Sequence, residues 1–236
     1  KDKTVAIAKR YGAKIRTIGK LGDARYEDYK ISKGKYLFSL DSDQVLDPRV
    51  VEECVILCEE KGFDAVTISE QSIISKGTYL ECLIAYDKWL VDKTRSDDAV
   101  FGTACPRFFR KDLFDNVQWP KGLSVFDDTI LYVVLKNNGA RIAYLSKSSI
   151  RHHEVTSWKI FIKKFYRYGQ GYLGAFKSQP STIAAHSLPR RSYFTAAAFS
   201  KPQYFLGLQL LYGVKVFSAG LGALAGIIEQ ILKKGI

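Results

Sequence analysis

The chain has 236 residues, of which 47% are hydrophobic and 25% are charged, and its 36 Lys and Arg against 24 Asp and Glu give a net charge of +12. This composition excludes an intrinsically disordered chain and is sufficient for one large domain, or for one domain with an appendage. The four cysteines lack metal-type pairing, so we expect free thiols rather than zinc ligands or disulfides.

The positive charge is concentrated in the last third of the chain. Residues 1–150 contain 24 Lys and Arg against 22 Asp and Glu, whereas residues 151–236 contain 12 against 2. The front of the chain is therefore nearly neutral, and the back is basic, aromatic and apolar. We expect a polyanionic partner to bind this C-terminal part of the chain, and nucleic acid and anionic lipid headgroups are the candidates.

Helical and strand-like patterns alternate in the first part of the chain. Helices are predicted over residues 3–11, 23–32 and 47–61, and strands over residues 13–18, 36–40 and 64–69. Asp2 is placed to cap the first helix, and Asp47 followed by Pro48 is a typical helix start. This αβαβαβ order predicts an α/β fold with a mainly parallel sheet and helices on both faces.

The alternation continues beyond this point. Helices are predicted over residues 78–93, 112–116, 127–138 and 152–172, strands over residues 104–109 and 141–145, and a loop over residues 178–190.

The last helical segment, residues 204–232, is uncharged and mostly apolar apart from Lys215 and Glu229. A membrane-spanning helix needs about 20 apolar residues, and the longest uncharged stretch, residues 216–228, has thirteen. The pattern therefore favours a pair of interfacial helices on a membrane surface. The alternative is a helical hairpin packed on the rest of the domain.

Asp41 and Asp43 follow directly on an apolar strand-like run. Ligands of open α/β sheets gather where such strands end, and two carboxylates held there suit Mg²⁺ or Mn²⁺. The two acids would repel each other without a cation between them. Gln44 could add a neutral oxygen. A solvated acidic turn is the alternative interpretation.

Two further polar groups could carry chemistry. Asp127 and Asp128 precede a predicted helix, where one carboxylate can cap the helix and the other can act as a general base on an attacking hydroxyl. His152 and His153 are neighbours on an extended segment and point to opposite faces, so one of them could reach a metal ion or a phosphate. The alternative for the acidic pair is a helix N-cap with a neighbour that suits the helix dipole, and the alternative for the histidines is ordinary surface residues.

Several short motifs, taken in order, resemble those of glycosyltransferase family 2, the inverting enzymes with the GT-A nucleotide-sugar fold. Each motif alone is weak, and their shared order over residues 1–175 carries the resemblance. They are Asp2-Lys3-Thr4, Ala24-Arg25, Ser32-Lys33-Gly34, Asp41-Ser42-Asp43, Pro106-Arg107-Phe108-Phe109-Arg110, Asp127-Asp128, Gly139-Ala140-Arg141-Ile142 and His153.

The resemblance implies roles for the acidic motifs. Asp41 and Asp43 would form the D-x-D motif, which binds the sugar nucleotide and, with His153, a divalent Mn²⁺ or Mg²⁺ ion. Asp128 would be the catalytic base, and Asp127 would replace the family's usual Glu beside it.

The resemblance also implies roles for basic and aromatic residues. Arg25 would lie near the nucleotide. Residues 164–168 are similar to the Q-x-x-R-W motif of processive members, which would place Arg167 on the nucleotide sugar and Tyr168 on the acceptor side. Lys164 replaces the Gln and Tyr168 replaces the Trp, and these departures argue against processive polymerisation.

The implied organisation is a GT-A-like domain over residues 1–175 and a basic helical tail over residues 176–236 that associates with a membrane. Family members begin with a strand and an acidic segment that bind the nucleotide base. This sequence opens just after the corresponding point, so we expect a further segment upstream.

The sequence and the resemblance together predict a metal-dependent inverting glycosyltransferase at the cytoplasmic face of a membrane. It would move a sugar from a nucleoside diphosphate donor to a glycan or a lipid-linked acceptor, with no nucleic-acid partner. The alternatives are a non-catalytic protein that binds nucleic acid or another polyanion, and a binding-only relative of the family.

Overall fold

The computed structural model describes residues 3–94, 105–115 and 117–233. The helix cap expected at Asp2, the first residue of the strand expected over residues 104–109 and the last residue of the helix expected over residues 112–116 lie outside this part of the chain.

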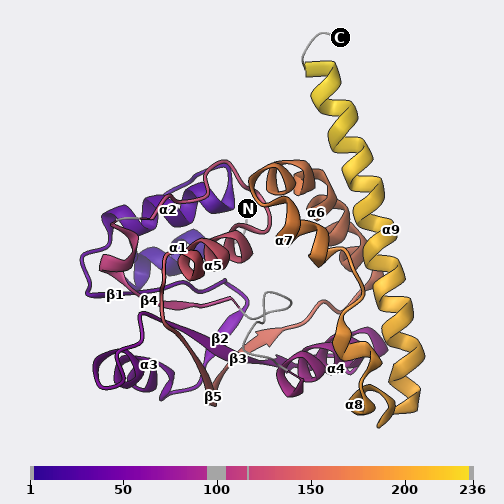
Figure 1. Ribbon diagram of the computed structural model, residues 1–236, viewed down its shortest axis with the longest axis horizontal. Coiled ribbons are helices and arrows are strands. Elements are labelled where there is room, and N and C mark those ends of the chain that lie inside the picture. Colours follow the sequence, from indigo (N-terminus) through magenta and orange to yellow (C-terminus); the bar gives the residue numbers. More distant parts are fainter. Residues whose placement is uncertain (1–2, 95–104, 116, 234–236) are drawn as a thin grey trace.

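Helices and strands alternate from α3 to α6, whereas the chain begins with two helices followed by two strands, so the expected αβαβαβ order was wrong at the start (Figure 1). The α-helices are α1 (Thr4–Arg10), α2 (Leu21–Ile31), α3 (Val50–Glu59), α4 (Tyr79–Lys93), α5 (Asp127–Asn137), α6 (Trp158–Ser178), α7 (Pro180–His186), α8 (Ala196–Phe199) and α9 (Pro202–Lys233). The strands are β1 (Tyr36–Phe38), β2 (Gln44–Leu46), β3 (Ala65–Ile73), β4 (Phe108–Arg110) and β5 (Ile142–His153). Two short 3-10 helices are η1 (Lys111–Phe114) and η2 (Arg191–Phe194).

The described strands form one sheet in the order β1-β4-β3-β5-β2. Its two long central strands, β3 and β5, are parallel, while β1–β4, β4–β3 and β5–β2 are antiparallel. The α/β class is therefore confirmed, but the described sheet is mixed rather than mainly parallel. The difference arises because three short strands, of three residues each, return along the edges of the central pair.

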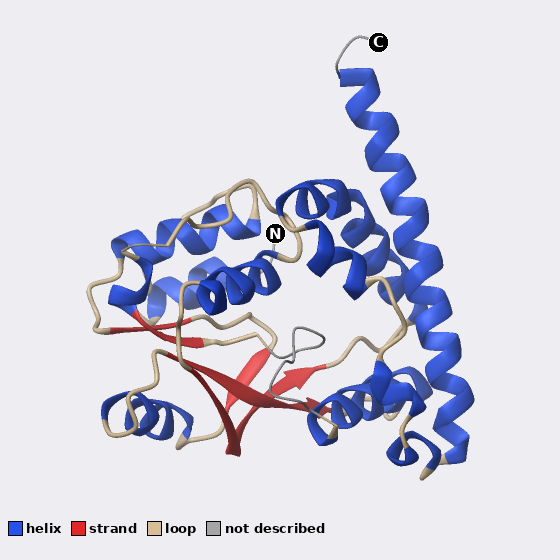
Figure 2. Ribbon diagram, viewed as in Figure 1, coloured by secondary structure: helices blue, strands red, loops and turns tan. Residues whose placement is uncertain are grey.

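Helices cover both faces of the sheet, as predicted (Figure 2). On one face α3 packs Cys54 and Cys58 against Val66 of β3, and on the other face Ala65 packs against Leu135 of α5. Successive residues of β3 thus enter opposite cores, which is the period-two alternation of a strand buried on both sides. The cysteines are free, as expected.

Some local expectations were wrong. Residues 13–18 form no strand and are largely exposed, because no described strand pairs with them. The loop expected over residues 178–190 contains α7, and β5 extends to His153 instead of ending near residue 145. This extension follows a shift in register, in which Ile68 pairs with Leu145 but Ser69 pairs with Ser149.

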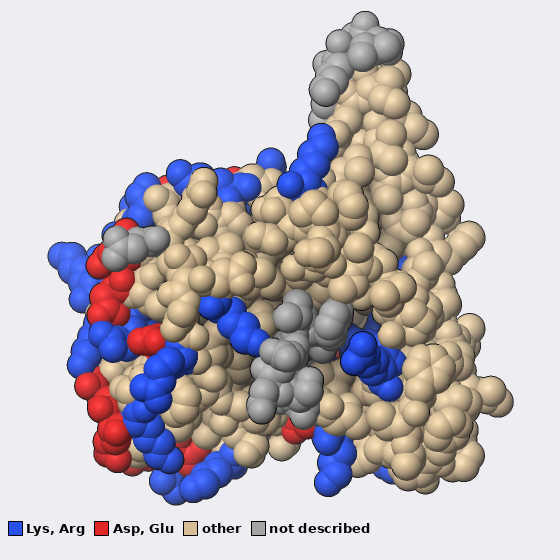
Figure 3. All heavy atoms as spheres, in the orientation of Figure 1, with Lys and Arg blue, Asp and Glu red and all other residues tan. Residues whose placement is uncertain are grey.

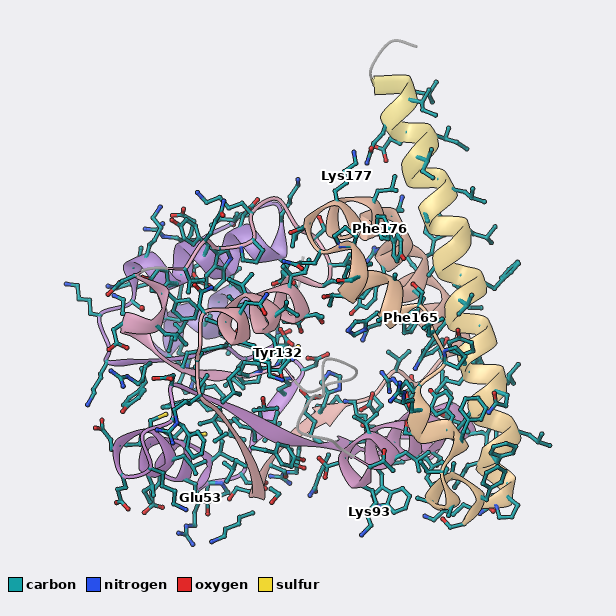
Figure 4. The ribbon with its side chains drawn as sticks, viewed as in Figure 1. Glu53, Lys93, Tyr132, Phe165, Phe176 and Lys177 are labelled. Carbon is teal, nitrogen blue, oxygen red and sulfur yellow. The ribbon has the colours of Figure 1, made fainter. Side chains whose placement is uncertain are left out.

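The C-terminal segment is one continuous helix, so the expected helix pair was wrong. α9 runs beside α4 and α6, and its C-terminal end extends past the body of the molecule (Figure 1). The domain boundary expected after residue 175 falls within α6. A buried ion pair joins α9 to α4, since Lys215 Nζ lies 2.9 Å from Asp87 Oδ2. Lys215 also lies over the ring of Phe165, which faces α9 (Figure 4).

Glycines bring the backbones of α6 and α9 into direct contact. A Cβ atom added at Gly222 would overlap the carbonyl oxygen of Tyr166, and one added at Gly169 would overlap that of Ala219. A Cβ at Gly226 would lie 2.9 Å from the carbonyl oxygen of Gln170. The two helices can therefore hold this separation only with glycine at these positions.

We expect Gly222→Val to lower the free energy of unfolding by roughly 2–3 kcal/mol, because the added side chain forces α9 away from α6. Urea unfolding followed by circular dichroism measures the change. Gly220→Ala on the same helix is the matched control, since a Cβ there meets nothing within 4 Å. It should leave stability unchanged or raise it by up to about 1 kcal/mol. Equal losses from both variants would contradict the close contact.

Candidate functional site

A tight turn at the end of β1 places the first two acidic residues. The Gln44 N–H donates to the Asp41 carbonyl at 3.1 Å, and the Asp41 N–H donates to the Gln44 side-chain oxygen at 3.0 Å. The side-chain oxygen of Gln44, expected as an extra ligand, is thus engaged within the turn. β2 begins at Gln44 and pairs with β5, so the turn is held between the two edges of the sheet.

Arg25 of α2 joins two of the predicted acids. Its Nη2 lies 3.0 Å from Asp41 Oδ1, and its Nη1 lies 2.7 Å from Asp127 Oδ2. These carboxylates come from the end of β1 and the start of α5. A planar guanidinium with two forked N–H groups can hold both at once. The structure therefore brings together Arg25, Asp41 and Asp127.

The pKa values of this group reflect burial opposed by charge pairing. Burial alone would raise the pKa of Asp41, but Arg107 and Arg25 hold it below its ordinary value. Burial and the neighbouring Asp128 raise the pKa of Asp127 despite its ion pair with Arg25. The Arg25 guanidinium stays charged, because Asp127, Asp128 and Asp41 outweigh its burial and raise its pKa.

The turn before α5 directs the second acidic pair into the site. α5 begins at Asp127, and its N-cap residue is Phe126, so the expectation that one of the two acids caps the helix was wrong. Phe126 has φ 59°, an unfavourable left-handed conformation for an aromatic residue. Its ring lies 6.2 Å from that of Tyr168 and 5.7 Å from that of His186, and these contacts hold the strained residue.

The two acids of the pair have different surroundings. Asp127 is 4% exposed and ion-paired with Arg25. Asp128 is half-buried, and its Oδ1 accepts a hydrogen bond of 2.7 Å from the Thr129 N–H. Asp128 is thus the more accessible of the two to an acceptor.

Tyr168 of α6 lies at the edge of the same cluster, where its ring contacts Phe126, and it is 36% exposed. Arg167 beside it is also exposed. Burial and the charges of Asp128, Asp41 and Asp127 raise the pKa of Tyr168 to about 12. Its phenol therefore stays protonated beside the acids, where it can donate a hydrogen bond.

The two adjacent histidines point in different directions, as the sequence predicts for an extended segment. His152 Nε2 lies 3.4 Å from Asp43 Oδ2, whereas His153 Nδ1 lies 3.4 Å from the hydroxyl of Ser75. Asp43 is about half exposed and His152 is largely buried. The histidine beside the D-x-D turn is therefore His152, and the resemblance had pointed to His153.

A divalent cation fits this end of the site better than the space between Asp41 and Asp43. Both oxygens of Asp41 already meet guanidinium groups, of Arg25 and Arg107. Among the described residues, no three or more His, Cys, Asp or Glu side chains form a ready cation cage. Asp43 and His152 do offer one carboxylate oxygen and one imidazole nitrogen at a partly exposed position, and these are the residues that would hold a divalent cation here.

Sequence reasoning gave no role to four charged residues behind the site. They are Glu70 on β3, Lys88 on α4, Arg107 before β4 and Glu154 after β5, and all four side chains are largely buried. A signal was present for Lys88, which lies four residues after Ile84 and three before Val91, on the apolar face of its helix. Glu70 follows directly on the five buried residues, 65–69, of β3.

The fold is similar to that of S. aureus TarS 1-349. The TM-score is 0.50 at 13% identity for one crystal structure, with 100% of this chain and 80% of that chain covered. It is 0.53 at 14% identity for the complex with UDP-GlcNAc, with 95% and 79% covered. It is 0.50 at 16% identity for the complex with UDP, with 95% and 78% covered. A search of curated proteins found no match.

A family comparison accounts for most of the chain. The model described as "Glycosyltransferase like family 2" matches residues 3–171, a range that includes α2, the D-x-D turn, the Asp127-Asp128 pair and Tyr168. The nucleic-acid-binding alternative has no comparable support. The order of motifs, the mixed α/β fold and this match agree that the protein is a nucleotide-sugar glycosyltransferase and that the chain belongs to glycosyltransferase family 2.

Proposed function

We propose that the protein is a metal-dependent inverting glycosyltransferase that acts at a membrane surface on a glycan or a lipid-linked acceptor. The observation that carries the proposal is the cluster around Arg25, in which Asp41 and Asp127 share one guanidinium beside Asp128 and Tyr168. Carboxylates that can act as the catalytic base and a cationic side chain that can pair with the donor thus lie at one place in the fold.

The proposed chemistry is a direct displacement at the anomeric carbon of the donor sugar. Asp128 takes the proton of the acceptor hydroxyl, the acceptor oxygen bonds to the anomeric carbon, and the sugar–phosphate bond breaks with its electron pair passing to the diphosphate. Asp127 is already paired with Arg25, and this pairing favours Asp128 as the base. Tyr168 lies on the acceptor side of the same acids.

The diphosphate leaving group needs positive charge. A divalent cation would supply it as a Lewis acid, and Asp43 with His152 would hold that cation. Arg167 is exposed on α6 next to Tyr168, where we assign it to the nucleotide sugar. Asp41, held between Arg25 and Arg107, is left to bind the nucleotide.

The donor and the metal can be tested together. TarS has been crystallised with UDP-GlcNAc and with UDP, so uridine donors come first. We expect UDP to raise the melting temperature only when Mn²⁺ is present, and His152→Ala to reduce that rise more than His153→Ala. GDP and TDP serve as comparison nucleotides. A rise that is equal with excess chelator would exclude the metal, and the opposite order of the two variants would return the assignment to His153.

The membrane part of the proposal rests on α9. Of the described helices, Pro202–Leu232 is long and apolar enough to cross a membrane, with a mean hydropathy of 1.6 and only 22% of its most apolar window buried. Figure 3 shows mostly uncharged atoms over α9, while charged side chains gather over the opposite part of the molecule. The exposed apolar residues recur every three, four or seven positions, so they share one face: Leu206, Leu210, Phe217, Leu221, Leu224 and Ile228.

The position of α9 favours attachment along the surface of a bilayer. Its first half is fixed to the protein by Leu208 and Leu211, which are fully buried, and by the pair of Lys215 with Asp87. The exposed face therefore lies on the outside of the folded body. Exposed cations such as Lys159, on α6, and Lys201, just before α9, suit anionic headgroups.

We expect replacement of Leu210, Phe217 and Leu224 by Gln to weaken binding to anionic liposomes at least about tenfold, because each side chain removes apolar area from the contact. Liposome flotation measures the bound fraction. Deleting α9 would be a poorer test, since the deletion would also remove buried core residues.

The matched control for this experiment replaces three exposed apolar residues elsewhere, Val5, Ile7 and Val51, by Gln. This variant should float like the unmodified protein. Equal flotation of all three proteins would remove α9 as the membrane contact.

A further inference from the structure

A chain of ion pairs runs behind the donor site from Asp41 to His152. Arg107 Nη1 lies 3.2 Å from Asp41 Oδ2, and its Nη2 lies 3.5 Å from Glu70 Oε1. Glu70 Oε2 lies 3.5 Å from Lys88 Nζ, which lies 2.7 Å from Glu154 Oε1. The same Glu154 oxygen lies 3.4 Å from His152 Nδ1. From Asp41 to Glu154 the charges alternate, so each of these five groups meets a neighbour of opposite charge.

The four inner residues of the chain are shielded from solvent. The side chains of Arg107, Lys88, Glu70 and Glu154 are 10%, 10%, 5% and 4% exposed. Burying charges in this way is costly, and well-packed apolar residues of similar size are often as stable or more stable. Stability alone therefore accounts poorly for this arrangement, and positioning of the groups at its two ends accounts for it better.

The four residues come from separate elements that meet behind the site. Glu70 is on β3, Lys88 is on α4, Arg107 precedes β4 and Glu154 follows β5. Glu70 lies just after the shift in the β3–β5 register, where Ser69 pairs with Ser149. The same shifted register carries β5 on to His152, which pairs with Gln44 next to the D-x-D turn. The geometry that places the histidine thus also places the carboxylates behind it.

Contacts with residues other than His152 hold the Glu154 side chain in place. Lys88 Nζ and the Ser72 hydroxyl each lie 2.7 Å from its Oε1. The Glu154 side chain is only 4% exposed, so these two contacts hold its carboxylate in place in the interior. With Glu154 beside Nδ1, the other ring nitrogen, Nε2, faces Asp43. Metal-binding histidines commonly have a carboxylate beside the ring nitrogen that does not bind the metal.

We propose that Glu154, held by Lys88 and Glu70, is a positioning residue that orients His152 toward the donor cation, and that the same buried chain ties His152 through Arg107 to Asp41. This inference rests on the proposed function, because it assumes that Asp43 and His152 hold the cation. It adds a role for buried residues that do not touch the substrate.

The test measures binding of Mn²⁺ alone, from the electron paramagnetic resonance signal of the free ion, in the full chain. We expect Glu154→Gln to weaken Mn²⁺ binding about 10- to 100-fold. The double variant Lys88→Met, Glu154→Gln removes one charge of each sign, so Glu70 keeps Arg107 as its partner and the buried charge stays balanced. We expect it to melt close to the unmodified protein and still to bind Mn²⁺ weakly. Glu59→Gln, which removes an exposed carboxylate of α3 paired with Lys35, is the matched control and should bind normally.

The outcomes separate the positioning role from the cation site itself. Asp43→Asn should also lose Mn²⁺ binding. If it does and Glu154→Gln binds normally, the positioning role is wrong and the cation site stands. If the double variant recovers both its melting temperature and Mn²⁺ binding, Glu154 has only a structural role. If the unmodified protein binds no Mn²⁺, or Asp43→Asn binds it equally well, the cation site fails and the positioning role fails with it.

Discussion

Asp128→Asn is expected to lower the rate of sugar transfer to a hydroxyl acceptor by about 10²- to 10⁴-fold, the usual contribution of a positioned general base. The amide cannot take the acceptor proton. Asp128 is half-buried and does not share the Arg25 ion pair, so the variant should keep its melting temperature and its affinity for UDP. Steady-state kinetics should therefore show a fall in kcat with little change in the donor KM.

Two comparison variants make this result specific. Asp112→Asn removes an exposed carboxylate that pairs with Arg110 and should leave transfer unchanged. Asp127→Asn breaks the pair with Arg25 and should lower the melting temperature as well as the rate. Normal transfer by Asp128→Asn, with loss of transfer in a well-folded Asp127→Asn, would assign the base to Asp127. An acceptor phosphate, already ionised, would hardly need either group.

The parts of the site that sequence could predict are those set by local pattern. An apolar run that ends in Asp41 and Asp43 marks the end of a strand, whichever strand it pairs with. The Asp127-Asp128 pair marks the start of a helix whose apolar positions are regular, and the structure places the pair in the first turn of α5. The resemblance added Arg25, and the structure places it on both acidic motifs. The local sequence pattern thus located the acids, whereas Arg25, whose guanidinium they share, could be identified only from the resemblance to a known family.

The parts that sequence could not predict depend on pairing between distant strands. The choice between His152 and His153 follows from the register of β5 against β2 and β3, and a shift by one residue would exchange their faces. The buried chain behind the site depends on the same register. Single-sequence periodicity contains no information about which strands pair, so it also missed the antiparallel edges of the sheet.

The C-terminal helix shows the opposite limitation. Lys215 divides the apolar tail in the sequence, and a count of uncharged residues therefore predicted short interfacial helices. In the structure Lys215 is neutralised by Asp87 of α4, 128 residues away, and the helix continues through it. The sequence pattern gave no role to the glycines at which α9 contacts α6, and in the fold they are packing contacts.

The largest effect on stability is expected from Arg25→Met. Removing the guanidinium leaves Asp41 and Asp127 without the cation that they share, and breaking a buried pair typically costs 3–5 kcal/mol. Asp41 is partly exposed, so we expect a loss of roughly 3 kcal/mol in the free energy of unfolding at neutral pH. The free energy of unfolding of Arg25→Lys should lie between those of the unmodified protein and Arg25→Met, because one ammonium cannot reproduce the forked contact with both carboxylates.

The pH dependence of this loss distinguishes electrostatics from packing. Without Arg25 the pKa values of Asp41 and Asp127 should rise in the folded state, so both groups bind protons more readily folded than unfolded. Such groups destabilise the fold above their folded pKa and cease to do so as the pH falls through it. The deficit of Arg25→Met should therefore shrink in acid, as measured by urea unfolding at several pH values. Arg110→Met, which removes an exposed guanidinium paired with Asp112, should cost under about 1 kcal/mol. A deficit of Arg25→Met that stays constant with pH would mean that Arg25 acts through packing, and the shared ion pair would then not be what holds the two acidic motifs together.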